Sequence, residues 1–262
     1  MDLELKNKRA LVLASSQGLG RAIAQALVHE GAHVLICGRS ADKLAAVAKD
    51  MSAGGTGKAD YVVADLADAG AAQTLYKAAQ EKLGGVDVLV NNTGGPPPGT
   101  TSAPAADDWR KQFDAMILRV MEITNLCLPG MRERGWGRIL TVASSGVVQP
   151  IPNLAMSNTL RSALVGWTKS LSNEVAADGI TANMLLPGRI HTERVDQLDE
   201  AASKRTGKDL DEVRTAARAA IPAGRYGRPE EFAAVAAFLV SGPASYVTGS
   251  AVRCDGGAIK SV

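Results

Sequence analysis

Tyrosine is absent from the middle of this 262-residue chain, where none occurs between Tyr76 and Tyr226. A phenol is one of the side chains that neighbouring charges can tune to donate a proton near neutral pH. Histidine, the commonest side chain in that role, is almost as scarce, since His191 is the only one beyond residue 33. The sequence therefore leaves few candidates for a proton donor in its central part.

Metal ligands are also scarce. The three cysteines, Cys37, Cys127 and Cys254, lie far apart with no C-x-x-C spacing, which argues against a disulfide framework or a zinc site. His29 and His33 are two nearby imidazoles, but two ligands alone seldom hold a metal ion. We expect no metal site, and we interpret the cysteines as buried structural thiols.

A strong charge of either sign is missing as well. The net charge is +2, from 29 basic and 27 acidic residues, and no lysine or arginine tract occurs, so binding to nucleic acid is disfavoured. Residues 1–9 alternate charged and apolar side chains and include no apolar segment typical of signal peptides or membrane spans. We expect a soluble, cytoplasmic protein with neither nucleic acid nor a membrane as its partner.

What the sequence does contain is a regular alternation of short apolar runs and longer segments of helical period. This alternation predicts a parallel sheet with helices on both faces. We therefore expect an α/β fold with a Rossmann-type doubly wound sheet, forming one domain over residues 1–262. The predicted strands are 9–13, 33–37, 61–63, 86–90, 138–142, 181–186 and 251–254, and the predicted helices are 19–29, 41–51, 68–83, 107–134, 154–177 and 229–240.

Three segments have features of their own. The helix predicted over 107–134 has Asp107 as its expected N-cap and Pro129 as an expected break or kink. The Gly- and Pro-rich segment 94–99 suits a fixed loop at the end of a strand. Residues 196–218 hold six acidic and five basic side chains among 23. They predict a solvated helical excursion, and the wider segment 192–222 is an alternative lid over the sheet edge.

A glycine-containing loop, Ala-Ser-Ser-Gln-Gly-Leu-Gly at 14–20, joins the first strand to the first helix. Glycines at this junction let backbone N–H groups approach a pyrophosphate at the positive end of the helix dipole. Gly18 and Gly20 match that pattern, but Ala14 stands where the dinucleotide fingerprint has its first glycine. A nucleotide site is therefore one interpretation, and a simple tight turn is the other.

The residue at the end of the second strand indicates which of the two nicotinamide cofactors, NAD or NADP, is bound. An acid there would bind the ribose 2′-hydroxyl of NAD, whereas an arginine pairs with the 2′-phosphate of NADP. Arg39 occupies this tip, and Asp42 fits the first turn of the next helix, after Ser40 as N-cap. We expect NADP(H) in preference to NAD(H), with a solvated surface role for Arg39 as the alternative.

Five short motifs follow one another along nearly the whole chain: Gly-Leu-Gly at 18–20, Asn-Asn-Thr-Gly at 91–94, Leu-Pro-Gly at 186–188, Tyr-Val-Thr-Gly at 246–249 and Asp-Gly-Gly at 255–257. In this order they resemble the short-chain dehydrogenase/reductase family, and within it the 3-oxoacyl-acyl-carrier-protein reductases. The resemblance implies a homo-oligomer, a dimer or tetramer packed through the two long helices. It also implies a cofactor site made of Ser15, Ser16, Gln17, Gly18, Gly20, Arg39, Asp65, Leu66, Asn92, Thr93, Gly94, Pro187, Gly188, Ile190 and Thr192.

The catalytic positions implied by the resemblance carry unusual residues. The family pattern is a serine, a tyrosine and a lysine, with an asparagine on the long helix before them. Here the corresponding residues are Ser144, Ser157, Arg161 and Met116. A serine hydroxyl is far less acidic than a phenol, and arginine stays protonated under ordinary conditions, so the usual titrating pair is missing.

Arg161 still follows Ser157 by one helical turn and is able to clamp a carboxylate or stabilise an enolate. The proton would then come through water or from His191. The alternatives for Arg161 are anchoring of a ribose or phosphate, or a surface salt bridge. A serine hydrolase is disfavoured because no serine lies on a G-x-S-x-G elbow.

These observations leave three hypotheses. The first is an NADP(H)-dependent oxidoreductase that acts on a small carbonyl or activated-alkene substrate through an atypical site. The second is an NADP(H)-binding protein without redox catalysis, such as a sensor or scaffold. A cleft for another nucleotide, such as S-adenosylmethionine, is the third. Met116, Met156 and the prolines at 96–98 either line an apolar cleft or belong to the core.

Overall fold

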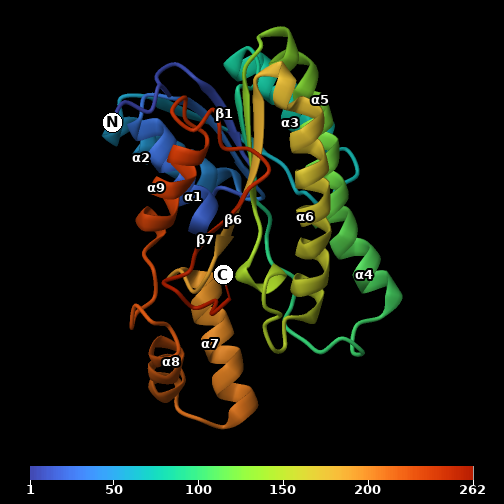
Figure 1. Ribbon diagram of the computed structural model, residues 1–262, viewed down its shortest axis with the longest axis vertical. Coiled ribbons are helices and arrows are strands. Elements are labelled where there is room, and N and C mark those ends of the chain that lie inside the picture. Colours follow the sequence, from blue (N-terminus) through green and yellow to red (C-terminus); the bar gives the residue numbers. More distant parts are fainter. Residues whose placement is uncertain (262) are drawn as a thin grey trace.

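A single parallel sheet of seven strands forms the centre of the computed structural model, which describes residues 1–261 (Figure 1). The strand order is β3-β2-β1-β4-β5-β6-β7, so the direction of winding reverses between β1 and β4. The α/β doubly wound fold predicted from the alternation is therefore confirmed. The strands are β1 (Arg9–Val12), β2 (His33–Gly38), β3 (Lys58–Val63), β4 (Val88–Asn91), β5 (Gly137–Val142), β6 (Ile180–Pro187) and β7 (Ala251–Cys254).

Helices cover both faces of this sheet. On one face lie α1 (Gly18–His29), α2 (Ala41–Gly54) and α9 (Pro229–Leu239), and on the other lie α3 (Ala71–Leu83), α5 (Arg119–Glu133) and α6 (Ala155–Val175). Side chains alternate along each strand, so Val12 and Ile36 pack with α1 and α9, whereas Leu11 and Leu35 pack with α3 and α5. The central strands are buried on both faces, which is why they read as continuous apolar runs.

The segment before α6 departs most from the prediction. Helix α4 (Ala106–Phe113) has Ala105 as its N-cap, so the assignment of Asp107 as N-cap was wrong. Asp107 lies in the first turn instead, and the Asp108 carboxylate accepts a hydrogen bond from the Ala105 amide at 3.2 Å. One wide π turn, Asp114–Leu118, joins α4 to α5. The break or kink in the long helix was expected at Pro129, but α5 continues through Pro129 to Glu133. The interruption of the helix lies at Asp114–Leu118 instead.

Packing explains why the proline does not end α5. Leu128 and Met131, on either side of Pro129, are buried against the sheet. This burial offsets the loss of one backbone hydrogen bond. A smaller difference concerns α3, which begins at Ala71 because residues 65–71 form hydrogen-bonded turns, with Asp68 N donating to Asp65 O at 3.0 Å.

The mixed-charge segment is a pair of helices, α7 (Glu193–Thr206) and α8 (Leu210–Ala219), which pack against each other. They project beyond the carboxyl end of β6, at the lower end of Figure 1. The predicted helical excursion is confirmed, and its role as a lid stays a prediction. Among residues 1–261, no helix combines the length and the apolar character needed to cross a bilayer.

Candidate active site

The loop between β1 and α1 is shaped to receive an anion. Its N-cap residue, Gln17, makes no side-chain hydrogen bond to the first turn of α1, so the helix begins without a side-chain cap. Gly18 has a φ of +59° and Ala14 a φ of +45°. The left-handed backbone that the dinucleotide fingerprint assigns to its first glycine is thus retained here by an alanine, at some conformational cost.

Two buried side chains hold this loop in place. The Ser15 hydroxyl donates to Val12 O at 2.6 Å and accepts from Cys37 N at 3.0 Å. The Asn92 amide donates to Leu13 O and Ala14 O at 3.2 and 3.1 Å. These side chains position the backbone that a phosphate would contact, and direct contact of Ser15 or Asn92 with a nucleotide stays a prediction.

Close packing explains Gly20. A Cβ on Gly20 would lie 2.6 Å from both Ala14 O and Asn92 Nδ2. Any larger residue would therefore push the loop away from β4. The glycine is required by the approach of β4 to α1, whether or not a ligand is bound.

The tip of β2 forms a basic corner beside this loop. Arg39 is exposed and has no ion pair within residues 1–261, and Gly38 lies against Ser16, whose Oγ would be 3.0 Å from an added Cβ. Ser40 caps α2 as predicted, with its Oγ accepting from Lys43 N at 3.4 Å. The Lys43 ammonium donates to the Gln17 side chain.

Lys43 was missed by the sequence interpretation. Its place in the first turn of the helix that follows Arg39 was the available signal, because a side chain there can turn back toward the strand tip. The adjoining strand end holds Asp65 and Leu66, both partly buried. Ala64 N donates to Gly38 O at 2.9 Å, which places them beside the tip of β2.

Just after β4 lie a threonine hydroxyl that has no hydrogen-bond partner in the described part of the chain and a glycine with open space beside its backbone. The Thr93 hydroxyl is buried and has no hydrogen-bond partner among residues 1–261. A Cβ built on Gly94 would meet no atom within 4 Å. This segment therefore combines open space beside the Gly94 backbone with a buried hydroxyl whose hydrogen-bonding capacity no described residue uses.

The loop after β6 faces the glycine loop. The Thr192 methyl lies 4.0 Å from the position of a Cβ on Gly18. Gly188 packs on Asp255, whose Cα would be 2.7 Å from an added Cβ, and Ile190 is buried in a bridge with Gly227. Pro187 and its neighbours thus lie at the same sheet edge as the glycine loop and the end of β4, because all these strands are parallel.

Arg161 lies at the carboxyl ends of β4 and β5. Its guanidinium donates to Val142 O at 2.9 Å, to Gly94 O at 3.3 Å and to Thr93 O at 3.4 Å. The side chain is buried and has no ion pair within residues 1–261, which removes the surface salt bridge as an explanation. Burial, together with the charge of Arg194, lowers the pKa of Arg161 to about 10, so the group stays cationic at neutral pH.

Ser144 and Ser157 complete this corner. The Ser144 Oγ accepts from Gly146 N at 3.0 Å, which leaves its own proton free to be donated. Ser157 is buried one helical turn before Arg161, and its hydroxyl makes no hydrogen bond to residues 1–261. Ser144 follows β5, to which Arg161 bonds, and Ser157 lies on α6 together with Arg161.

Met116 lies in the wide turn between α4 and α5, in a buried cluster with Ala143, Met156 and Leu160. π turns of this kind are frequent at functional sites. The thioether supplies neither a proton nor a strong acceptor. This position therefore contributes apolar packing behind Ser144, and no proton relay.

The tyrosines outside the central stretch do not replace the missing phenol. The Tyr226 hydroxyl donates to Asp199 at 2.8 Å, and burial together with this bond raises its pKa. Tyr246 is fully exposed. His191 is largely exposed, with Nε2 at 3.4 Å from an Asp196 oxygen and its ring 6.2 Å from that of Tyr226, and its role as proton donor stays a prediction.

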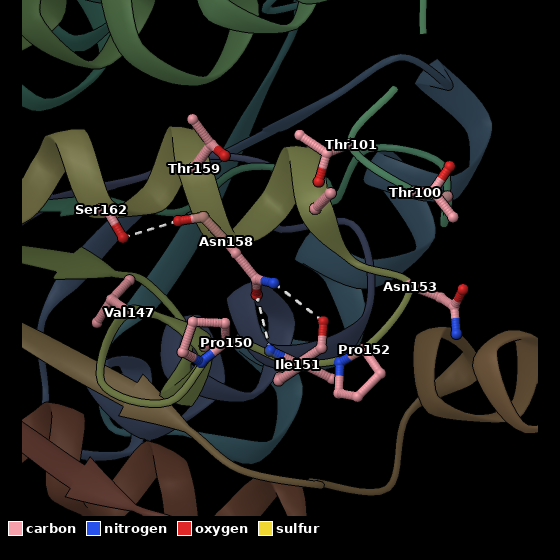
Figure 2. A pocket seen from close by; sticks show the side chains of 13 residues that line it. Thr100, Thr101, Val147, Pro150, Ile151, Pro152, Asn153, Asn158, Thr159 and Ser162 are labelled. Atoms are coloured by element: carbon pink, nitrogen blue, oxygen red, sulfur yellow. Dashed lines mark hydrogen bonds between the residues drawn. The ribbon is translucent and has the colours of Figure 1, made fainter. Parts of the chain in front are cut away.

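Two cavities border this corner. The larger, about 570 Å³, lies between α6 and residues 147–153 and is lined by neither Ser157 nor Arg161 (Figure 2). Asn158, in its lining, donates to Ile151 O at 2.9 Å and accepts from Ile151 N at 3.2 Å. The smaller cavity, about 320 Å³, is lined by Pro97, Pro98 and Met156 among others. Two of the expected proline positions and Met156 thus face a cavity, whereas Met116 belongs to the core.

Comparison with known proteins agrees with this geometry. The family model described as enoyl-(acyl carrier protein) reductase matches residues 13–258. The chain belongs to the short-chain dehydrogenase/reductase family. The family resemblance carried by the five motifs is thereby confirmed.

Similar members of the family match nearly the whole length of the chain. The 3-oxoacyl-[acyl-carrier-protein] reductase FabG of Vibrio cholerae is 32% identical, over 97% of this chain and 98% of its own. A putative ketoacyl reductase of Streptomyces coelicolor is 34% identical, over 95% of each chain. Among solved structures, L-sorbose reductase from Gluconobacter frateurii, complexed with NADPH and L-sorbose, has a TM-score of 0.94, 31% identity and complete coverage of both chains.

Within this short-chain dehydrogenase/reductase, the residues predicted for the site come together from distant parts of the chain. The glycine loop, the tip of β2 and the ends of β4 and β6 meet at one sheet edge, and Arg161, with Ser144 and Ser157, lies at the ends of β4 and β5. The individual contacts to cofactor and substrate stay predictions.

Proposed function

We propose that the protein is an NADP(H)-dependent oxidoreductase that acts on a small carbonyl or activated-alkene substrate. The observation that carries this proposal is the basic corner beside the uncapped start of α1. Arg39 has no acidic partner there, and Lys43 adds a second charge. Arginine and lysine at this position favour a ribose 2′-phosphate, and the NADPH bound by L-sorbose reductase supports the same cofactor.

The residues present fit a nicotinamide dinucleotide. The α1 amides and Ser16 would hold the phosphates, and the unpartnered Thr93 hydroxyl and the open backbone of Gly94 would meet a ribose. When bound, the nicotinamide supplies a hydride to a carbonyl carbon, or to an alkene carbon conjugated with a carbonyl. One proton then completes the reduction.

The chain's own contribution is electrostatic. The Arg161 cation, buried at the ends of β4 and β5, stabilises negative charge that develops on a substrate oxygen. The Ser144 and Ser157 hydroxyls donate hydrogen bonds to the same oxygen. Neither hydroxyl is acidic enough to give up its proton alone, so we assign the proton to water or to His191.

The test is a turnover assay with NADPH and, separately, NADH, against neutral and acidic carbonyls and conjugated alkenes, with nicotinamide absorbance as readout. We expect oxidation of NADPH with at least one substrate class and slower oxidation of NADH. A protein that binds NADPH but turns over no member of a broad panel contradicts the proposal.

Met116 and Ser157 favour a second candidate, an NADP(H)-binding protein without redox catalysis, because neither side chain replaces the family's proton-transfer groups. On this hypothesis S157Y together with R161K creates or raises activity while the dissociation constant of NADPH stays the same. Robust turnover by the unaltered chain excludes it.

We also propose that the active form is a homo-oligomer that packs through α5 and α6. The support is the family membership and the half-exposed Phe113 on the adjoining α4. Light scattering on a sizing column tests it. A mass of about 27 kDa at micromolar concentration, that of one chain, contradicts it.

A further inference from the structure

Two arginines reach the same short backbone segment from different elements. Arg161 on α6 donates to the carbonyls of Thr93 and Gly94 at 3.4 and 3.3 Å. Arg194, in the first turn of α7, donates from Nη2 to Pro96 O at 2.6 Å. Its guanidinium lies 3.1 to 3.3 Å from where a Cβ on Gly95 would be. Residues 93–96 are therefore held between two guanidinium groups, and we call this arrangement the arginine pair.

Neither charge of the arginine pair is balanced. Within residues 1–261, no carboxylate oxygen lies within 4.0 Å of either guanidinium. Two other arginines of the same region are paired, Arg189 with Asp199 at 2.5 Å and Arg214 with Asp196 at 2.9 Å. Burial lowers the pKa of both members, and the charge of Arg194 lowers that of Arg161 further.

An unbalanced cation is costly to folding when it is buried, as Arg161 is, and less so when it is half-buried, as Arg194 is. Backbone carbonyls satisfy part of the hydrogen-bonding capacity of a guanidinium but do not neutralise its charge. A bound anion would neutralise it and would bind bidentately to a planar fork of donors. The start of α7 adds the positive end of a helix dipole, because Thr192 provides no side-chain cap.

We propose that the substrate carries a carboxylate that binds between Arg161 and Arg194, which makes it an oxo acid or an unsaturated acid. This inference rests on the proposed function and narrows its substrate class. The cofactor pyrophosphate is the other source of anionic oxygens, but the glycine loop and α1 provide for it at the end of β1. The arginine pair lies at the end of β4 instead.

The smaller cavity indicates what the rest of the substrate is. Pro97, Pro98 and Met156 line this space of about 320 Å³, directly after Pro96 and directly before Ser157 in the chain. The prolines and Met156 suit a short apolar chain, while Asp108, Lys111 and Gln112 give the same cavity a polar side. Neither arginine lines this cavity, and its link to the arginine pair is the short run of chain from Pro96 to Pro98. A substrate that binds its carboxylate at the arginine pair would have these prolines beside its hydrocarbon part.

The test measures binding, so it does not depend on turnover. NADP⁺-saturated protein is titrated calorimetrically with 2-oxohexanoate, 3-oxohexanoate and their methyl esters, for the wild type and for R194Q, R194K and R205Q. Arg205 is an exposed arginine at the far end of α7 and is the matched control. NADPH affinity is measured by fluorescence for every variant.

We expect R194Q to weaken binding of at least one acid roughly tenfold or more, since hydrogen bonds to charged groups are worth that much. The esters and NADPH should bind R194Q as they bind the wild type, R194K should be intermediate, and R205Q should be unchanged.

Two outcomes overturn the inference. If R194Q weakens NADPH as much as it weakens the acids, Arg194 serves the cofactor phosphates. If neither acid binds the wild type better than its ester, the arginine pair is no carboxylate site, and turnover of neutral carbonyls would still support the proposed function. Charge-dependent binding of an acid without any turnover establishes the carboxylate site and contradicts the oxidoreductase proposal alone.

Discussion

At the scale of single residues, most of the polar groups at the candidate site act on the backbone rather than on a ligand. Ser15 bonds to the backbone at the end of β1, and Asn92 bonds to main-chain oxygens of the glycine loop. The groups left free are Arg39, the Thr93 hydroxyl and the Ser157 hydroxyl. A substitution among the first group should therefore affect stability, and one among the second should affect binding.

Arg39→Gln tests the cofactor preference. We expect the dissociation constant of NADPH to rise roughly tenfold and that of NADH to stay the same, because only NADPH carries the 2′-phosphate that would lose a charge-assisted hydrogen bond. Fluorescence titration gives both constants. Lys49→Gln, on the exposed face of α2, is the control. Equal loss for both cofactors would assign Arg39 a structural role.

Gly20→Ala tests the close approach of β4 to the glycine loop. The new Cβ would overlap Ala14 O and Asn92 Nδ2 at 2.6 Å, so the loop must move and NADPH affinity should fall at least tenfold. Gly54→Ala, at the end of α2 with no atom within 4 Å of the new Cβ, is the control and should bind normally. Unchanged affinity of Gly20→Ala would show that the loop shape is not needed.

At the scale of elements, the Asp199 carboxylate is a buried anchor between α7 and the body of the protein. Asp199 is completely buried, accepts from the Tyr226 hydroxyl at 2.8 Å and pairs with Arg189 at 2.5 Å. Arg189 follows β6 and Tyr226 precedes α9. One carboxylate thus joins the helix pair to two loops of the sheet edge.

Asp199→Ala should loosen α7 and α8 without unfolding the sheet. Removing the acid leaves Arg189 without its partner and the Tyr226 hydroxyl without its acceptor, at a cost of roughly 2 to 4 kcal/mol. We expect faster amide hydrogen exchange over 193–219 and unchanged exchange in β1, β4 and β5. Mass spectrometry of peptides measures this. Uniformly faster exchange would mean that the anchor supports the whole fold.

The elements that sequence analysis predicted well are those whose burial is simple. Strands β1, β5 and β6 are covered on both faces and appear as apolar runs, so their ends were predicted to within a residue. The edge strand β3 begins at Lys58, three residues before its predicted start. Its first residues include polar side chains, so they do not form the apolar run from which the strand was predicted. The turn at Asp114–Leu118 depends on packing against α6, which no local pattern records.

The same distinction holds for the site. Strand ends meet at one edge in any parallel sheet, so the grouping of Gly18, Arg39, Gly94 and Gly188 followed from the order of elements. Arg194 and Lys43 were not predicted to take part. Their directions depend on how α7 and α2 are packed, and this is a tertiary property.

At the scale of the whole molecule, the two ends of the sheet differ in character. The amino ends of β1 and β4 hold an ion cluster, in which Asp87 contacts Arg9 at 2.6 Å and Arg134 at 3.0 Å. Burial alone would raise the pKa of Asp87, but the hydrogen bonds and charges of Arg9, with the charge of Arg134, outweigh it and lower the pKa.

Stability should therefore depend on Asp87 in a defined pH range. Because the folded-state pKa lies below the ordinary value of 3.8, the contribution is present above that value and is lost as pH falls through the folded-state pKa. We expect Asp87→Asn to lower the free energy of unfolding by about 3 kcal/mol at pH 7 and by less below pH 4. Urea denaturation measures both.

Asp50→Asn provides the control for this prediction. Asp50 pairs with Arg21 at 3.0 Å on the exposed surface, where an ion pair contributes only about 0 to 1 kcal/mol. A loss for Asp87→Asn no larger than that for Asp50→Asn, or one that does not depend on pH, would contradict the assignment.

The ion cluster at the strand starts has a consequence for descent within the family. Arg9, Asp87 and Arg134 stabilise the sheet at the amino ends of its strands. The loops at the carboxyl ends of the strands are therefore not needed for this stabilisation. Changes of side chain in those loops then leave the ion cluster, and with it the scaffold, in place. New substrate preferences in lineages of this kind should arise through exchange of tip loops, with the opposite edge inherited unaltered.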